Sequence, residues 1–151
     1  MSFLSTKTYN HNVGLSCCFR QWRAKDSHCQ FLHGYSISVR FNFKTDELDE
    51  RNWVYDFGDL KDVKKFLQDT FDHKTIIAED DPELETFKML EEKKLVQLTI
   101  MPDVGCEKFA EYIYSKINPI ITLKTNDRVK ILSVEVREHG ANSAIYMRDK
   151  S

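Results

Sequence analysis

The stretch "SHCQFLHGYSISVRF", residues 27–41, decides how the rest of the sequence is interpreted. Its second half places an apolar residue at every second position from Ile37 to Phe41. This two-residue period is typical of a strand with one buried face. Cys29 and His33 stand directly in front of that strand, and both are residue types that bind metals or transfer protons. The stretch therefore predicts a strand that begins at a candidate site.

The residues before the strand allow two interpretations. His33 and Tyr35 share the parity of Ile37, so we expect both side chains on the apolar face of the sheet. A histidine at a strand end is either structural or a ligand. An unpaired cysteine such as Cys29 is either a small apolar side chain or a nucleophile whose proton a nearby base removes. From the residues alone both interpretations stay open.

Further strands lie on either side of this one. Alternation predicts a preceding strand through Val13, Leu15, Cys17 and Phe19, and a late strand through Leu132, Val134 and Val136. The turn sequence "HGANS" then leads to a last strand at residues 144–147. Glu138 continues the parity of the late strand. We therefore expect this carboxylate to point to the apolar face of the sheet. A charged side chain is unusual there unless it binds a partner or reaches into water at the end of the strand.

Two helices are predicted between these pairs of strands. One apolar face with a spacing of three and four residues comprises Leu60, Val63, Phe66, Leu67 and Phe71, and the other comprises Cys106, Phe109, Ala110, Ile113 and Ile117. We expect the second helix to stop before Pro119. Residues 78–101 between them form a charged excursion, with a short helix from about Pro82 and a short strand at about residues 96–100.

The order strand, strand, helix, helix, strand, strand predicts an α+β fold. We expect a four-stranded antiparallel sheet with the two helices on one face. A sheet of this size leaves exposed edges, which favours assembly through them. The length of 151 residues predicts a single domain over 1–151.

The composition does not favour some classes of partner. The 22 basic and 24 acidic residues give a net charge of −2, which does not favour nucleic acid or an anionic membrane as partner. The sequence has no apolar run long enough to span a membrane, and its start lacks the features of a signal peptide, so we expect a cytoplasmic protein. In a reducing compartment the four cysteines are expected as thiols, ligands or nucleophiles.

A second candidate site lies at the end of the first helix, where "FDHK" occupies residues 71–74. An aspartate can orient a neighbouring imidazole and increase its basicity, so Asp72 and His73 are a candidate acid–base pair. Adjacency in sequence does not by itself make the two side chains face each other.

The sequence resembles the family of 6-pyruvoyltetrahydropterin and 6-carboxytetrahydropterin synthases, which have the T-fold. Four segments carry the resemblance in the family's order: "CQFLHGYSISVRF", "WVYDFGDLKDVKKFLQDTFDHK", "GCEKFAEYIYSKI" and "VEVREHGANSAIY". The resemblance implies a catalytic set of Cys29, Asp72 and His73. It also implies that Glu138 binds the guanidine-like edge of a pterin through two charge-assisted hydrogen bonds, with Glu107 nearby.

The resemblance also implies a zinc ion held by three histidines, but this sequence departs from that ligand set. The family's His-Gly-His motif is His33-Gly34-Tyr35 here, and Phe19 stands at the position that best matches the first histidine. Only His33 remains as a metal ligand. Cys18, Cys17 or His28 are alternatives, although alternation places Cys18 on the wrong face unless the strand bulges.

As function, the resemblance implies a 6-carboxy-5,6,7,8-tetrahydropterin synthase-like enzyme on the route to queuosine and other deazapurines. It would cleave the side chain of 7,8-dihydroneopterin triphosphate and eliminate triphosphate. Arg20 and Arg23 lie in the loop before Cys29 and are candidates for binding the phosphates, or are ordinary solvated charges. The alternatives are a pterin- or purine-binding homologue with altered or lost metal-dependent chemistry, and a non-catalytic assembly subunit. The family further implies a homo-oligomer, a trimer whose sheets join into a barrel or a hexamer, with sites between subunits.

Overall fold

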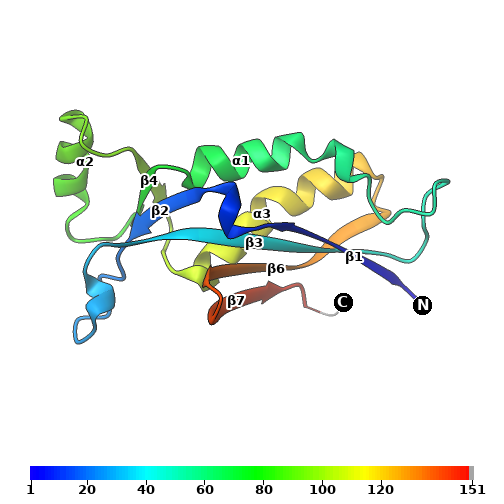
Figure 1. Ribbon diagram of the computed structural model, residues 1–151, viewed down its shortest axis with the longest axis horizontal. Coiled ribbons are helices and arrows are strands. Elements are labelled where there is room, and N and C mark those ends of the chain that lie inside the picture. Colours follow the sequence, from blue (N-terminus) through cyan, green and yellow to red (C-terminus); the bar gives the residue numbers. More distant parts are fainter. Residues whose placement is uncertain (150–151) are drawn as a thin grey trace.

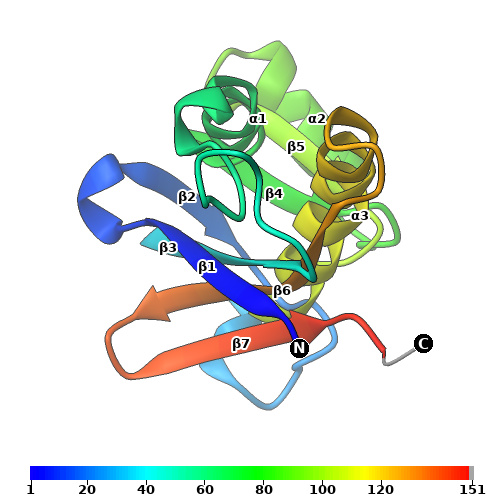
Figure 2. The same cartoon turned by 90° about the vertical axis from the view of Figure 1, so that its right-hand side faces the viewer.

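The longest strand, β3 (His33–Thr45), is the strand on which the sheet is built. The computed structural model describes residues 1–149 and shows a sheet with the order β5-β4-β2-β3-β6-β7. The first half of β3 pairs with β2 (Leu15–Phe19), its second half pairs with β1 (Phe3–Tyr9), and its other edge pairs with β6 (Val129–His139). All three pairings are antiparallel. The two long helices lie together on one face of the sheet, and the short third helix stands apart from them at one end of the molecule (Figure 1; Figure 2).

The expected α+β fold and its four antiparallel strands are confirmed. They are β2, β3, β6 and β7 (Asn142–Met147), which neighbour one another in that order. Two strands were not predicted: β1, whose sequence FLSTKTY is largely polar, and β4 (Lys74–Ala78). Strand β4 is parallel to β2 and almost wholly buried, so its apolar residues run continuously and do not alternate. The short strand expected at residues 96–100 is β5 (Leu98–Met101), parallel to β4.

Helices α1 (Lys61–Phe71) and α3 (Cys106–Lys124) cover the sheet, and α2 (Leu84–Glu92) lies in the charged excursion. The prediction that the second helix stops before Pro119 was wrong, because α3 continues for five residues beyond it. A proline inside a helix costs about 3 kcal/mol. Ile117 and Ile121 lie one turn apart on either side of it, and both are buried against the sheet. Burial of this continuous apolar face outweighs the hydrogen bond that the proline removes.

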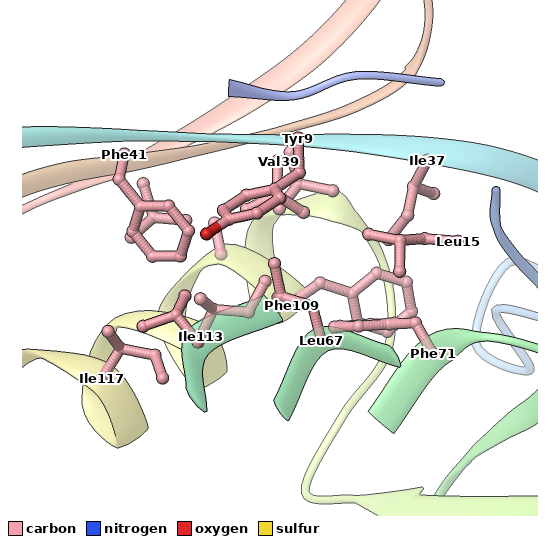
Figure 3. Packing of buried hydrophobic residues seen from close by; sticks show 14 of the residues in the cluster. Tyr9, Leu15, Ile37, Val39, Phe41, Leu67, Phe71, Phe109, Ile113 and Ile117 are labelled. Carbon is pink, nitrogen blue, oxygen red and sulfur yellow. The ribbon is translucent and has the colours of Figure 1, made fainter. Parts of the chain in front are cut away.

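One hydrophobic core fills the space between the sheet and the two long helices (Figure 3). Side chains from β1, β2 and β3 face side chains from α1 and α3. Those labelled in the figure are Tyr9, Leu15, Ile37, Val39 and Phe41 from the sheet, and Leu67, Phe71, Phe109, Ile113 and Ile117 from the helices.

The parity predicted for the late strand holds for only part of its length. Asn42 pairs with Ser133 but Phe43 pairs with Ile131, so Leu132 lies in a bulge between the two pairs. The prediction that Leu132 shares the apolar face was wrong, because Ile131 takes the buried position and Leu132 is only half-buried. Residues after the bulge keep the predicted parity, with Val134 and Val136 both fully buried. This segment leads into Glu138, where the pairing of β6 with β7 is irregular between Arg137 and His139.

No helix among residues 1–149 combines the length and the apolar character needed to cross a membrane.

Candidate active site

Three aromatic rings meet on the helix-covered face where β2 ends and β3 begins. Phe19 and His33 are register partners, with ring centroids 5.0 Å apart. Tyr35 lies two residues further along β3, 5.4 Å from the His33 ring and 6.1 Å from the Phe19 ring. Between them, Gly34 brings β3 close to β2, since a Cβ there would lie 3.1 Å from the carbonyl oxygen of Cys17. Because the rings of His33 and Tyr35 both lie beside Phe19 on the helix-covered face, the predicted parity of these two residues is confirmed.

Glu138, near the end of β6, is the half-buried carboxylate beside this cluster. Burial raises the pKa of Tyr35, and the negative charge of Glu138 raises it further. Burial also raises the pKa of the Cys106 thiol to about 12, with added contributions from Glu138 and Glu107. Tyr35 and Cys106 therefore stay protonated and can donate hydrogen bonds toward Glu138. The structure brings Glu138 and Glu107 together around the first residue of α3.

Cys29 lies in η2 (His28–Gln30), a single 3-10 turn between β2 and β3. The Ser27 hydroxyl accepts a hydrogen bond from the Cys29 N–H at 3.1 Å, and the Gln21 N–H donates to the Cys29 carbonyl at 2.7 Å. Cys29 is exposed, and it also contributes to raising the pKa of Tyr35. It therefore lies at the solvent side of the same cluster.

Asp72 and His73 face each other at the end of α1. The distance between His73 Nδ1 and Asp72 Oδ1 is 2.7 Å, and the His73 side chain is 80% exposed. His73 has a left-handed backbone with φ of 59°, which turns the chain from α1 into β4, and its N–H donates to the Ser16 carbonyl. Because Nδ1 carries the proton that binds the carboxylate, Nε2 is left free to accept one. The arrangement suits acid–base chemistry.

The structure does not bring Cys29 to the Asp72–His73 pair within one chain. The backbone N–H of His73 donates a hydrogen bond to the Ser16 carbonyl near the start of β2. The Cys29 carbonyl accepts one from the N–H of Gln21, just after the end of β2. These two anchor residues are separated by the length of β2, a distance of about 15 Å at ~3.3 Å per residue. A single chain therefore presents two half-sites.

Arg20 and Arg23, the candidate phosphate ligands, both pair with carboxylates from the excursion. Arg20 donates from Nε and Nη2 to the two carboxylate oxygens of Asp81, at 2.9 and 2.7 Å. Arg23 pairs with Asp80, which also accepts a hydrogen bond from the indole N–H of Trp22. The Arg20–Asp81 pair is largely shielded from solvent, whereas the side chains of Arg23 and Asp80 are about half exposed.

The residues on this face do not fit a zinc site. Of the three ring positions, only His33 supplies a good ligand, because Phe19 has none and the raised pKa of Tyr35 opposes formation of a phenolate. Cys18 lies on the other face in regular pairing with Gly34, and its thiol is 3.3 Å from the Thr75 hydroxyl.

The remaining alternatives do not complete a ligand set. Burial raises the pKa of the Cys17 thiol to about 12, with smaller contributions from Cys18 and Asp72. Within residues 1–149 no three histidine, cysteine or acidic side chains, His28 included, are grouped so that they could hold a metal ion.

Two residues of the site were not identified from the sequence. The apolar spacing indicates Cys106 only as a member of a helix face. Its position next to Glu107 at the start of α3 could have marked it as a residue near the site. Asp81 lies 61 residues from Arg20 in the sequence. The only signal was a pair of acidic residues in the excursion and an excess of basic ones in the loop after β2.

Comparisons with known proteins point to one family. The model of the family described as 6-pyruvoyl tetrahydropterin synthase matches residues 9–149. A 6-carboxy-5,6,7,8-tetrahydropterin synthase from Rickettsia felis is 40% identical over 57 residues, which are 37% of this chain and 41% of the relative. The protein of the same name from Aquifex aeolicus is 28% identical over 125 residues, covering 80% of this chain and 76% of the relative.

Solved structures confirm the expected fold. An uncharacterized protein from Wolinella succinogenes has a TM-score of 0.76 at 21% identity, with 99% of each chain covered. The 6-pyruvoyl tetrahydropterin synthase of Plasmodium falciparum has a TM-score of 0.67 at 18% identity, with 97% of this chain and 98% of that chain covered.

Proposed function

This chain belongs to the 6-pyruvoyl tetrahydropterin synthase family, and we propose that it is an enzyme with a 6-carboxy-5,6,7,8-tetrahydropterin synthase-like activity. Its substrate would be 7,8-dihydroneopterin triphosphate, in the route to queuosine and other deazapurines. The names of the curated relatives support this choice. The match to the Rickettsia felis relative spans about two fifths of that protein's length, 41%, so the activity itself is carried by the proposal.

The observation that supports the proposal best is the placement of Glu138 beside Tyr35 and Cys106, close to Cys29. A carboxylate at this position can accept two hydrogen bonds from the guanidine-like edge of a pterin ring. The half-buried rings of His33 and Tyr35, which stand edge to face, give the pterin ring a surface to pack against. Glu107, exposed in the first turn of α3, extends the acidic side of the same site.

Proton transfer is assigned to Cys29, Asp72 and His73. Cys29 would remove a proton from the substrate side chain, and the triphosphate would leave as its C–O bond breaks. The two outer carbons of the side chain would leave when the C–C bond next to the retained carbon breaks. His73, held by Asp72, would accept or return protons at Nε2. Because one chain separates these groups by the length of β2, we propose that the Asp72–His73 pair of a second copy completes the site. This agrees with the homo-oligomer that the family resemblance implies.

The triphosphate is assigned to the loop after β2. Arg23 suits this role, since its pair with Asp80 is exposed and can open when a phosphate competes for the guanidinium. Arg20 is committed to the buried Asp81, and its contribution to phosphate binding is expected to be smaller.

A second candidate function is a pterin- or purine-binding homologue in which the metal-dependent chemistry is altered or lost. Phe19 and Tyr35, which stand where the family resemblance implies histidine ligands, favour this alternative. No step of the proposed reaction is assigned to a metal.

One assay separates the two functions. Purified protein of known metal content would be incubated with 7,8-dihydroneopterin triphosphate, and the products and the released triphosphate would be measured together with the Kd of the pterin. Turnover supports the synthase-like enzyme. Binding without turnover supports the binding homologue, and the lack of both rules out either function.

A further inference from the structure

We propose that Asp81, acting through Arg20, is a positioning residue that holds Cys29 in place. The inference rests on the proposed function only for the catalytic role of Cys29. Asp81 lies near the beginning of the charged excursion at residues 78–101, between β4 and α2. The inference therefore assigns this excursion a role in positioning Cys29.

The first step is the geometry of the ion pair. Arg20 presents two N–H groups to both oxygens of Asp81, at 2.9 and 2.7 Å, which is the bidentate arrangement that suits a guanidinium. The Asp81 side chain is only 1% exposed, and its Oδ1 also accepts the Glu83 N–H at 2.8 Å. The carboxylate therefore joins the loop after β2 to the start of the excursion.

The second step connects this pair to Cys29. Arg20 Nη1 donates to the carbonyl of Gln30, the residue after Cys29, at 3.4 Å. The next residue, Gln21, donates its N–H to the carbonyl of Cys29 itself at 2.7 Å. Gln21 also donates from Nε2 to the Val104 carbonyl at 3.3 Å, just before α3. The backbone at Cys29 and just after it is thus fixed to Gln21 and Arg20.

The third step is electrostatic. Burial alone would raise the pKa of Asp81, but hydrogen bonds from Arg20 and from the Glu83 N–H lower it overall. Asp81 is therefore charged, and a buried charge without its partner is strongly unfavourable. This keeps the Arg20 side chain in a single arrangement. The exposed Arg23–Asp80 pair beside it lacks this constraint.

The chain supplies a matched pair of variants for the test. Asp81→Asn removes the buried charge without touching Arg20, and Asp80→Asn makes the same change at the neighbouring exposed position. Two quantities would be measured in the full-length protein: amide hydrogen exchange in residues 20–31, and kcat and KM for 7,8-dihydroneopterin triphosphate.

For Asp81→Asn we expect faster exchange in residues 20–31 and a fall in kcat on the order of 10- to 100-fold, the scale of a misplaced catalytic group, with KM little changed. Asp80→Asn should match the wild type in hydrogen exchange and in kcat, and only its KM should change, because the substitution releases Arg23 for the triphosphate. Arg20→Lys is the substitute variant if Asp81→Asn does not fold. It keeps the positive charge but loses the bidentate contact with Asp81, so it should also show faster exchange in residues 20–31 and a lower kcat.

Two results would overturn the inference. One is unchanged exchange in residues 20–31 of a folded Asp81→Asn variant, and the other is faster exchange with a wild-type kcat. A large rise in KM confined to the triphosphorylated substrate would instead assign Arg20 to phosphate binding, and would also overturn it. If the wild type itself shows no turnover, the proposed function fails, and hydrogen exchange alone decides whether Asp81 fixes the turn.

Discussion

Phe19 and His33 face each other across β2 and β3 with ring centroids 5.0 Å apart. With Tyr35 they form a triangle of side chains on one face, which is the spatial arrangement that three metal-binding histidines need. The backbone therefore retains the geometry of a three-ligand site, but the side chains supply one good ligand.

The first prediction is that metal binding can be restored at this triangle. Wild-type protein dialysed against zinc and then against buffer should retain no stoichiometric zinc, because His33 alone cannot hold the ion. The double variant Phe19→His and Tyr35→His should bind about one zinc per chain. Elemental analysis and calorimetric titration measure this. Tyr35→His alone serves as the control with two histidines, and stoichiometric zinc in the wild type would contradict the prediction.

The second prediction concerns Glu138. Glu138→Gln should weaken pterin binding by about 1.5–3 kcal/mol, the range of a hydrogen bond to a charged group, without unfolding the protein. Calorimetry with an unphosphorylated pterin gives the affinity. Glu135→Gln, on the same strand but on the opposite face, is the matched control and should bind normally. Equal affinity for the wild type and Glu138→Gln would remove Glu138 from the site.

The third prediction is a pH dependence of stability that arises from Cys106. The pKa of its thiol is raised from 9.0 to about 12 in the folded protein. Above pH 9 the unfolded chain releases this proton while the folded chain keeps it, so the free energy of unfolding falls as the pH rises toward 12, by up to about 1.4 kcal/mol per pH unit.

Chemical denaturation of the wild type and of Cys106→Ala between pH 8 and pH 10.5 isolates this contribution. The difference in stability between the two should shrink as the pH rises, because the other titrating groups are common to both. A difference independent of pH would show that the thiol does not titrate in this way.

How far the sequence predicts the structure depends on the range of the interactions involved. Glu138 was placed correctly by parity because β6 pairs regularly with β3 from Ser133 to Arg137, after the bulge at Leu132, and its pairing with β7 becomes irregular only between Arg137 and His139. The same bulge made the placement of Leu132 wrong, since an extra residue in one strand leaves no local mark. Adjacency made Asp72 and His73 a candidate pair but did not predict that their side chains meet, and the left-handed turn at His73 that accompanies this contact has no local mark in the sequence.

Long-range contacts account for the rest of what was missed. The Arg20–Asp81 pair joins segments 61 residues apart, and no periodicity connects them. The path of α3 through Pro119 depends on packing of Ile121 against the sheet, which outweighs a reliable local signal. Both results depend on tertiary packing.

The fourth prediction is complementation between copies. Cys29→Ala and His73→Ala should each abolish most turnover when purified alone. If the site combines Cys29 of one copy with His73 of another, unfolding the two variants together and refolding them as a mixture should recover part of the wild-type rate. The double variant, refolded with the wild type in the same way, controls for dilution. Absence of recovery in mixed oligomers would place both groups in one chain's own site.

The most direct test of the central claim is turnover of 7,8-dihydroneopterin triphosphate by the wild type and by Cys29→Ala, with the pterin product and triphosphate measured in the same samples. We expect the wild type to release triphosphate and form a tetrahydropterin product, and Cys29→Ala to bind the substrate without converting it. Equal turnover by the two proteins would contradict the role of Cys29, and no turnover by the wild type would contradict the assignment as a synthase-like enzyme.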